Sequence, residues 1–435
     1  MTDQTTTGQT PGGLGERDHF IPVRKIDVLD AVIAQGALAS EPEREQFRQL
    51  CRLLGAIYHY QYFDQLERLR NDYHYFSPEI DNGHARFDAA TLERAYLDLI
   101  ETLKGVLHNA NFIEIPHDEI DRAHREHALV QVDLQAPRDD YREVRFFRRG
   151  HHRETIEIAE WYGWRKRAAE IDVHDDVVLL VTMKSEPPTA EKRKRSRKVK
   201  VRPGAVLLKY FRDIARTDLN ALFPDVRVVM GLRDRLWLGV PALIGGIPIL
   251  LKLASTLTVL FLVAGFYMGL SGSAKEADTA AALAALSGLV AVGGFVAQQW
   301  TKFQRQSLLY QKILSENVYF RNVNNNAGIF DYIIREAEEQ ECKEAFLAYY
   351  FLLAPGGEPT EDGLDRRVEA WLRQAFGLDV DFECDDALVK LDRLGLLRRD
   401  GDRLAVPPLD EALVRLDRIW DNFFPIDGAR RAASG

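Results

Sequence analysis

The sequence reads LASTLTVLFLVAGFYMGL from Leu253 to Leu270 and, after the polar turn SGSAKEAD, TAAALAALSGLVAVGGFVAQQW from Thr279 to Trp300. A helix that crosses a bilayer core needs about 20 apolar residues, and each run is close to that length. The apolar stretch starts earlier, at Leu236, and Lys252 is the only charge that interrupts its first part. We therefore predict a transmembrane hairpin of two helices over residues 236–300.

The charges around the hairpin predict its orientation. Basic residues precede the first run and follow the second: Arg227, Arg233, Arg235, Lys302, Arg305 and Lys312. The turn between the runs carries one lysine against Glu276 and Asp278. Because segments rich in Lys and Arg stay in the cytoplasm, we expect an integral membrane protein with two spans and both termini cytoplasmic. The arginine-rich composition fits a bacterial source, and hence the inner membrane.

Small residues in both runs indicate how the two helices pack. Gly265 and Gly269 form a G-x-x-x-G pattern, and Ala281, Ala285 and Gly288 form a stripe in the second run. Such residues allow close approach of helices in lipid. The alternative is that Gly and Ala simply fill apolar helices.

Composition limits the partners and the compartment. The chain has 435 residues, with 57 Lys and Arg against 66 Asp and Glu, giving a net charge of -9. This balance argues against nucleic acid as a partner. The three cysteines are widely spaced and indicate free thiols in a reducing compartment. Residues 1–18 are polar and rich in Gly and Thr, so we predict a disordered tail there.

Residues 19–126 show helical spacing of apolar residues and many aromatic side chains. Histidines are dense near the end of this region, from His108 to His127 and on to His152. A metal site is the sharper interpretation and a solvated polar helix face the simpler one. The zinc motif H-E-x-x-H is absent and no cysteine lies nearby. We therefore predict no metal and no cofactor.

Alternating patterns rich in Val, Ile, Phe and Leu over residues 127–231 predict an antiparallel sheet domain of about six strands. Between two of these strands lies a strongly basic loop. Its basic residues, which are candidates for contact with an anionic lipid surface, are Lys192, Arg193, Lys194, Arg195, Arg197, Lys198, Lys200 and Arg202. Each is worth about 1 kcal/mol near such a surface. The alternative is a solvated hairpin tip.

After the hairpin, residues 301–354 again show helical spacing. The acidic run EAEEQECKE, Glu336–Glu344, lacks the Glu-x-x-His pairs of carboxylate metal sites, so we predict solvated surface charge. Residues 355–427 have the order helix, helix, hairpin, helix, which is that of a winged helix. Acidic residues outnumber basic ones there, so binding to protein is favoured over binding to DNA.

Several long stretches of the chain resemble one family. They are YFDQLERLRNDYHYFSPE, VLLKYFRDIARTDLNALFPDVRVVMGLRDRLWLGVPAL, YFRNVNNNAGIFDYIIREAEEQECKEAFLAYYFLL, RRVEAWL, DFECDDALVKLDRLGLL and LDRIWDNFF. They resemble the family called domain of unknown function 3754, which includes eukaryotic transmembrane protein 143. The resemblance covers nearly all of the chain beyond the first forty residues. It implies an integral membrane protein with two adjacent spans and implies no particular activity.

The sequence thus predicts an α+β protein, and three functions remain open. The first is a membrane-anchored, cytoplasm-facing interaction or scaffold protein that binds membrane lipid, protein partners or itself. The second is a membrane-bound, hydrolase-like enzyme with a site in the helical or sheet part, for which the histidines supply the candidate groups. The third is an oligomeric channel or transport component, for which Lys252 is the intramembrane charge. No P-loop, G-x-S-x-G or G-x-G-x-x-G motif is present.

Overall fold

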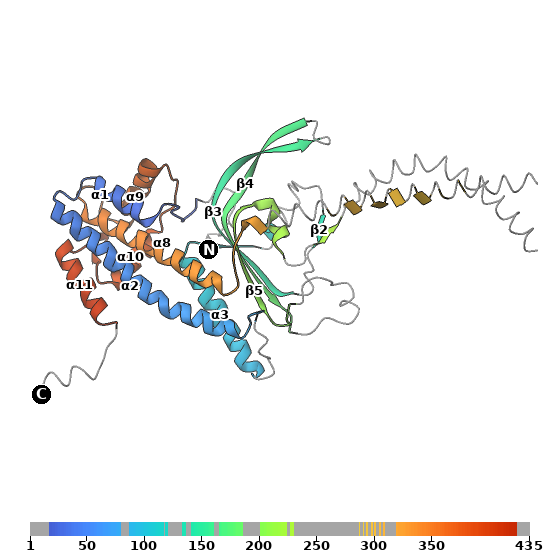
Figure 1. Cartoon of the computed structure of the whole chain (residues 1–435). Coiled ribbons are helices and arrows are strands. Elements are labelled where there is room, and N and C mark those ends of the chain that lie inside the picture. The colour runs from blue at the N-terminus through green and yellow to red at the C-terminus, as the bar shows by residue number, and fades with distance from the viewer. Residues whose placement is uncertain are drawn as a thin grey trace, which may run out of the picture. The chain divides into compact units, whose positions relative to one another are not determined.

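The computed structural model of the chain describes residues 17–79, 87–116, 118–120, 133–135, 141–160, 165–185, 201–223, 227–229 and 319–423, with scattered residues between 287 and 308 (Figure 1). The chain divides into two compact units. The main unit comprises Met1–Glu119, Asp139–Arg216 and Asn322–Gly435. The inserted unit comprises Ile120–Arg138 and Thr217–Arg321, so it contains the predicted hairpin.

The main unit combines helices with an antiparallel sheet, which confirms the predicted α+β class. Its helices are α1 (Lys25–Ala34), α2 (Glu41–His74), α3 (Ala89–Asn109), α8 (Gly328–Leu353), α9 (Glu361–Phe376), α10 (Cys384–Arg393) and α11 (Leu409–Asp421). One continuous apolar core joins all of them to the sheet. The regions that the sequence separates at residues 126, 301 and 355 therefore share a single core.

Helix α2 is long because its start is well capped and one face is apolar throughout. The Ser40 hydroxyl accepts from the Glu43 N–H, and the Glu43 carboxylate accepts from the Ser40 N–H, which forms a capping box. Buried residues from Phe47 to Tyr73 recur at helical spacing along the face toward α8. Of the aromatic residues in this stretch, Tyr58, Tyr62 and Tyr73 are buried, whereas Phe63 is exposed.

The sheet has five strands in the order β1-β3-β4-β5-β7, and every neighbouring pair is antiparallel. The strands are β1 (Ile113–Ile115), β3 (Tyr141–Glu160), β4 (Arg165–Met183), β5 (Val206–Ala215) and β7 (Asn322–Asn325). A second pair in the inserted unit joins β2 (Asp133–Gln135) to β6 (Arg227–Val229). The 3-10 helix η3 (Arg216–Leu222) follows β5.

Three details of the sheet differ from the predicted pattern. About six strands were predicted over residues 127–231, but the chain on both sides of Gly150 forms the single strand β3, because the glycine adopts φ +66° without ending the strand. A side chain at this position would collide with Asp175 on β4. In addition, β1 and β7 lie in regions that were predicted as helical, residues 19–126 and 301–354.

The chain leaves the main unit and returns to it at two neighbouring strands. The chain exits after β5 and returns at β7, and these two strands pair with Phe211 opposite Asn322. Ala215, the last residue of β5, lies four residues beyond Phe211. Because a strand rises about 3.3 Å per residue, the distance along β5 from Phe211 to Ala215 is roughly 13 Å. Both ends of the insertion therefore lie close together on one edge of the sheet.

The C-terminal part of the main unit contains α9, α10, the hairpin of β8 (Arg398–Asp400) with β9 (Arg403–Ala405), and α11. This order is the one predicted from the sequence. Thr360 caps the start of α9 and Gly377, at φ +70°, ends it. The segment packs on α8 and α2 within the common core.

The predicted spans lie mostly outside the part of the chain that the structure describes. A search of the described residues finds no helix with the length and apolar character needed to cross a bilayer. Scattered residues from Ser287 to Leu308, which include part of the second run, are helical. The packing candidates Gly265, Gly269, Ala281, Ala285 and Gly288 are outside the described residues.

Candidate functional site

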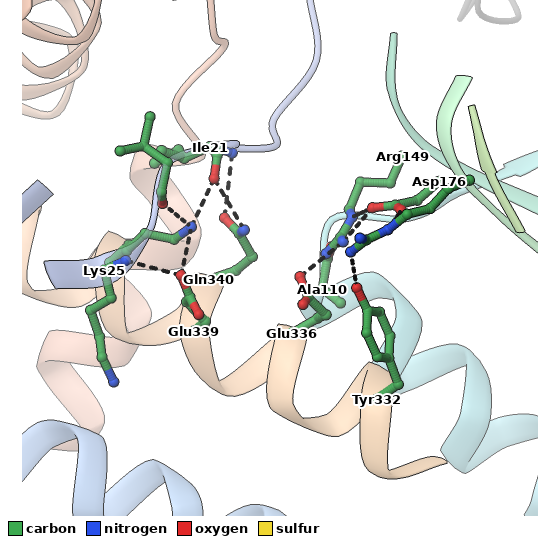
Figure 2. A network of polar contacts seen from close by, with 12 residues as sticks. Ile21, Lys25, Ala110, Arg149, Asp176, Tyr332, Glu336, Glu339 and Gln340 are labelled. Atoms are coloured by element: carbon green, nitrogen blue, oxygen red, sulfur yellow. Dashed lines mark hydrogen bonds and ion pairs between the residues drawn. The ribbon is translucent and has the colours of Figure 1, made fainter. Parts of the chain in front are cut away.

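Helix α8 carries an ionic network through the middle of the main unit. Residues Gln340 to Phe351 are buried on every side of the helix. The run Glu336–Glu344 was predicted as solvated surface charge, and this is wrong for Glu341 and Glu344, which are buried. A buried charge is stable only with a partner, and other elements supply the partners, as Figure 2 shows for one side of the helix.

Arg149 of β3 is the centre of the first cluster. Its guanidinium is 1% exposed and lies 2.5 Å from Asp176 of β4 and 2.9 Å from Glu336 of α8. It also donates to the Ala110 carbonyl, which follows α3, at 3.3 Å. Burial alone would lower the pKa of Arg149, but the neighbouring carboxylates raise it, so the charge is kept. One side chain thus joins two strands and two helices.

Aromatic and polar groups complete the surroundings of Arg149. Its guanidinium carbon lies 4.1 Å from the ring centre of Phe20 and 4.7 Å from that of Phe112, which are cation–π contacts. Arg212 of β5 approaches the other oxygen of Asp176 at 3.3 Å and donates to the Tyr332 hydroxyl of α8 (Figure 2). Arg149 and Arg212 therefore both donate to groups of the protein itself.

The segment Arg17–Val23, which we call the strap, is held by the same helix. Lys343 donates to the carbonyls of Ile21 at 2.7 Å and Val23 at 3.0 Å, and Gln340 exchanges hydrogen bonds with the Ile21 backbone. Glu339 accepts from the N–H of Lys25, the first residue of α1 (Figure 2). Burial lowers the pKa of Lys343 to about 8.

The start of the strap is paired with the C-terminal part of the chain. Arg17 lies 2.6 Å from Glu369 and 3.0 Å from Asp381, and Asp18 forms a β-bridge with Val380. Residues 17 and 18 therefore have defined contacts, although they belong to the predicted tail 1–18. The remainder of that tail is outside the described residues.

Lys390 of α10 is the centre of the second cluster. Its ammonium, 5% exposed, lies 3.4 Å from Glu341 and 2.7 Å from Asp386, and it contacts Glu344 as well. The other oxygen of Glu344 accepts from Asn111, whose amide also donates to the His19 carbonyl of the strap. Burial and the three carboxylates act oppositely on Lys390, and the carboxylates raise its pKa.

This second cluster makes stability depend on pH. Burial raises the pKa of Glu341 to about 7, with Glu344 and Asp386 also raising it and Lys390 opposing. A carboxyl with a raised pKa binds a proton in the folded state that the unfolded chain releases. Its stabilising contribution is therefore complete below the unfolded value near 4.5 and is lost as the pH rises through 7.

We expect Glu341→Gln to remove this loss. Relative to the parent protein, the variant should gain up to about 3 kcal/mol of unfolding free energy between about pH 4 and about pH 8. The measurement is denaturation in detergent, followed by near-ultraviolet circular dichroism across that range. His174, whose pKa burial lowers to about 3, has the opposite effect in both proteins, so the difference isolates Glu341. If the two proteins gave parallel curves of unfolding free energy against pH, the raised pKa of Glu341 would not be the cause of the loss.

His174 is the one buried histidine among the described residues. Both of its ring nitrogens lack a hydrogen-bond partner there. It pairs in register with His151 on β3 and Ile214 on β5. His151 and His152 are half exposed and lie near Asp18 and Asp175. No group of three or more metal-ligating side chains occurs among the residues that the structure places.

The sequence-predicted lipid candidates are mostly not placed by the structure. Lys192 to Lys200 are outside the described residues. Arg202 is placed, and its guanidinium donates to the carbonyls of Tyr75 at 2.9 Å and Ser77 at 3.2 Å, after the end of α2. This side chain therefore contacts the protein's own backbone. Arg149, Asp176 and Lys390 were not proposed as site residues. Each stands beside or near other charged residues in the sequence, so no local signal distinguished it.

Comparison with known proteins finds a family model that matches part of the chain. No solved structure matches the chain. Residues 174–328 match the family model described as a protein of unknown function, DUF3754. The match begins within β4 at His174 and ends at Gly328, where α8 starts, so it contains β5, β7 and the segment inserted between them. Over residues 174–328 the chain is thus similar to DUF3754, a family of unknown function.

Proposed function

We propose that the protein is a membrane-anchored interaction or scaffold protein whose main unit faces the cytoplasm. The observation that carries this proposal is the pairing of β5 with β7, which brings both ends of the insertion to one edge of the sheet. A hairpin that crosses a bilayer twice must likewise begin and end on the same side. The apolar runs Leu253–Leu270 and Thr279–Trp300 supply the length for such a hairpin.

The main unit supports an interaction role because its two buried charge clusters, around Arg149 and Lys390, contact groups of the chain itself. Arg149 and Lys390 are saturated by carboxylates and carbonyls of the chain itself, as expected for groups that specify one rigid arrangement. A rigid body held at a bilayer by two spans is suited to presenting a fixed surface to partners. The described part of the chain therefore favours the interaction role among the three functions considered.

The anchoring is tested by replacing residues 217–321 with a Gly/Ser linker. About ten such residues span roughly 17 Å, which is enough to join Ala215 to Asn322 along the sheet edge. We expect the parent protein to stay in the pellet after alkaline carbonate extraction and the linker variant to appear in the supernatant with its circular dichroism signature of a folded unit. Release of the parent protein by carbonate would contradict anchoring. A reporter fused after Gly435 should report the cytoplasm.

The basic loop is proposed to orient the main unit on anionic lipid. Seven of its basic residues fall within the nine positions from Lys192 to Lys200. Each would be attracted to an anionic surface from within a Debye length of about 8 Å. In the linker variant, changing these seven to Ser or Gln should abolish binding to vesicles with anionic lipid, measured by co-sedimentation. Binding should also fade with added salt. The matched control is Arg202→Gln, which removes a charge already held by Tyr75 and Ser77. Equal binding to neutral vesicles would overturn the idea.

Nucleic acid is not proposed as a partner. In a winged helix the second helix enters the major groove with its N-terminal residues. Here α10 begins with Asp385 and Asp386, and its lysine, Lys390, is buried against carboxylates. Phosphates would meet negative charge at this end of the helix. If the protein retarded duplex DNA in a gel mobility-shift measurement, and this retardation faded as salt was added, nucleic acid would have to be considered a partner.

A further inference from the structure

Strands β3 and β4 extend well beyond the rest of the sheet. Their pairing continues without a break from the Arg153–Asp172 pair to the Glu160–Arg165 pair. Strand β5 pairs with β4 only from Val173 onward, and β1 pairs with β3 only over Phe146–Arg148. Residues 153–160 and 165–172, which we call the arm, therefore form a two-stranded ribbon that projects from the sheet (Figure 1, at the top).

The arm has two open edges. In the described part of the chain, no third strand pairs with either side of it. Among the described strands, each edge therefore presents a row of backbone N–H and C=O groups without a ladder partner, and such a row is a template for pairing with another strand. An isolated two-stranded ribbon is also marginally stable in water, and added strands stabilise it. Both properties favour an arm that is completed by a further strand.

The two edges carry opposite charge. The β3 half contains Glu154, Glu157 and Glu160, while its one basic residue, Arg153, lies 3.3 Å from Asp172 across the ribbon. The β4 half contains Arg165, Lys166 and Arg167 in succession. Its acidic residues are Glu170 and Asp172, and Asp172 is the partner of Arg153. Opposite charges on neighbouring strands stabilise pairing and like charges oppose it. An acidic edge is thus complementary to the basic edge of an identical arm.

We propose that the arm is a self-association surface, in which the β3 edge of one copy pairs with the β4 edge of the next. Pairing of two β3 edges would set acidic residues against acidic residues, and pairing of two β4 edges would set basic against basic. The favoured contact is therefore head to tail, which builds a ring if it closes and a chain of copies if it does not. This names the partner in the interaction role proposed above, and it rests on that role.

The test uses the full chain purified in mild detergent, with its mass measured by analytical ultracentrifugation over a range of concentrations. We expect the parent protein to form assemblies larger than one copy. Glu154→Lys, Glu157→Lys and Glu160→Lys together give two basic edges. Arg165→Glu, Lys166→Glu and Arg167→Glu together give two acidic edges. Each set should weaken self-association at least about tenfold, since each removes the complementary contact.

Mixing the two charge-reversed proteins should restore the assemblies, because each then offers edges complementary to the other. This recovery also shows that both proteins are folded. The matched control exchanges the exposed ion pair between Glu358, which precedes α9, and Arg366 of α9 by Glu358→Lys and Arg366→Glu, which should leave association unchanged. A single copy of the parent protein at every concentration overturns the proposal, as does unchanged association of both reversed proteins. Either result leaves anchoring intact if carbonate still fails to extract the protein.

Discussion

Replacing Lys390 with methionine should lower the free energy of unfolding by about 3–5 kcal/mol, because it leaves buried carboxylates without their cation. The Lys390 ammonium lies among Glu341, Glu344 and Asp386, and the first two are buried between α8 and α10. Without it, these carboxyl groups must either take up protons or remain charged in an apolar core. The measurement is denaturant unfolding in detergent at neutral pH.

Two further variants separate the ionic effect from packing. The triple change Lys390→Met, Glu341→Gln and Glu344→Gln removes the lysine together with its two buried carboxylates and leaves only Asp386, whose side chain is 42% exposed. It should recover most of the loss, since no buried charge then lacks a partner. Arg393→Met, three residues further along α10 and without an ion pair among the described residues, should change stability by less than about 0.5 kcal/mol. A small loss in Lys390→Met itself would mean that the cluster is hydrated.

Arg149→Met is the second change with a large expected effect, again about 3–5 kcal/mol. It leaves Glu336 unpaired and Asp176 with Arg212 as its remaining cation. It also removes the charge from the ring of Phe20 in the strap. Besides the loss in unfolding free energy, we expect faster hydrogen exchange at the backbone amides of the strap and the start of α1.

Controls for Arg149 lie on the same strand. Arg149→Lys keeps the charge but cannot reach Asp176, Glu336 and the Ala110 carbonyl with one planar fork, so an intermediate loss is expected. Arg153→Met removes a pair with Asp172 that is mostly exposed, and should cost less than about 1 kcal/mol. If hydrogen exchange became faster only at the amides of the sheet and stayed unchanged in the strap, Arg149 would not be holding the strap.

Local patterns were sufficient for much of the helical part of the fold. The apolar spacing from Phe47 to Tyr58 predicted α2, and the order of elements from α9 to α11 was predicted from periodicity and turn residues. These signals reside within a dozen consecutive residues, because a helix buries one face at a fixed spacing. Strands β1 and β7 were missed because three or four residues are too few to show alternation.

The candidate site was beyond the reach of such patterns. The acidic run of α8 has the composition of a solvated face, and nothing near it in the sequence indicates otherwise. Its partners come from distant positions: Arg149 for Glu336, Lys390 for Glu344, and the Ile21 carbonyl for Lys343. Whether a carboxylate is solvated or buried depends on these contacts.

By itself the sequence determined the α+β class, most helices, the hairpin β8–β9 and the two apolar runs that predict the membrane anchor. These follow from hydrophobic periodicity, which acts between residues close in the chain. Only the tertiary structure decided that β5 and β7 are neighbours across the insertion, that β3 and β4 continue as an arm, and that residues 340–351 of α8 are buried on all sides. These depend on pairing and desolvation between segments far apart in sequence, where the free energy of a charge is set by which partner reaches it.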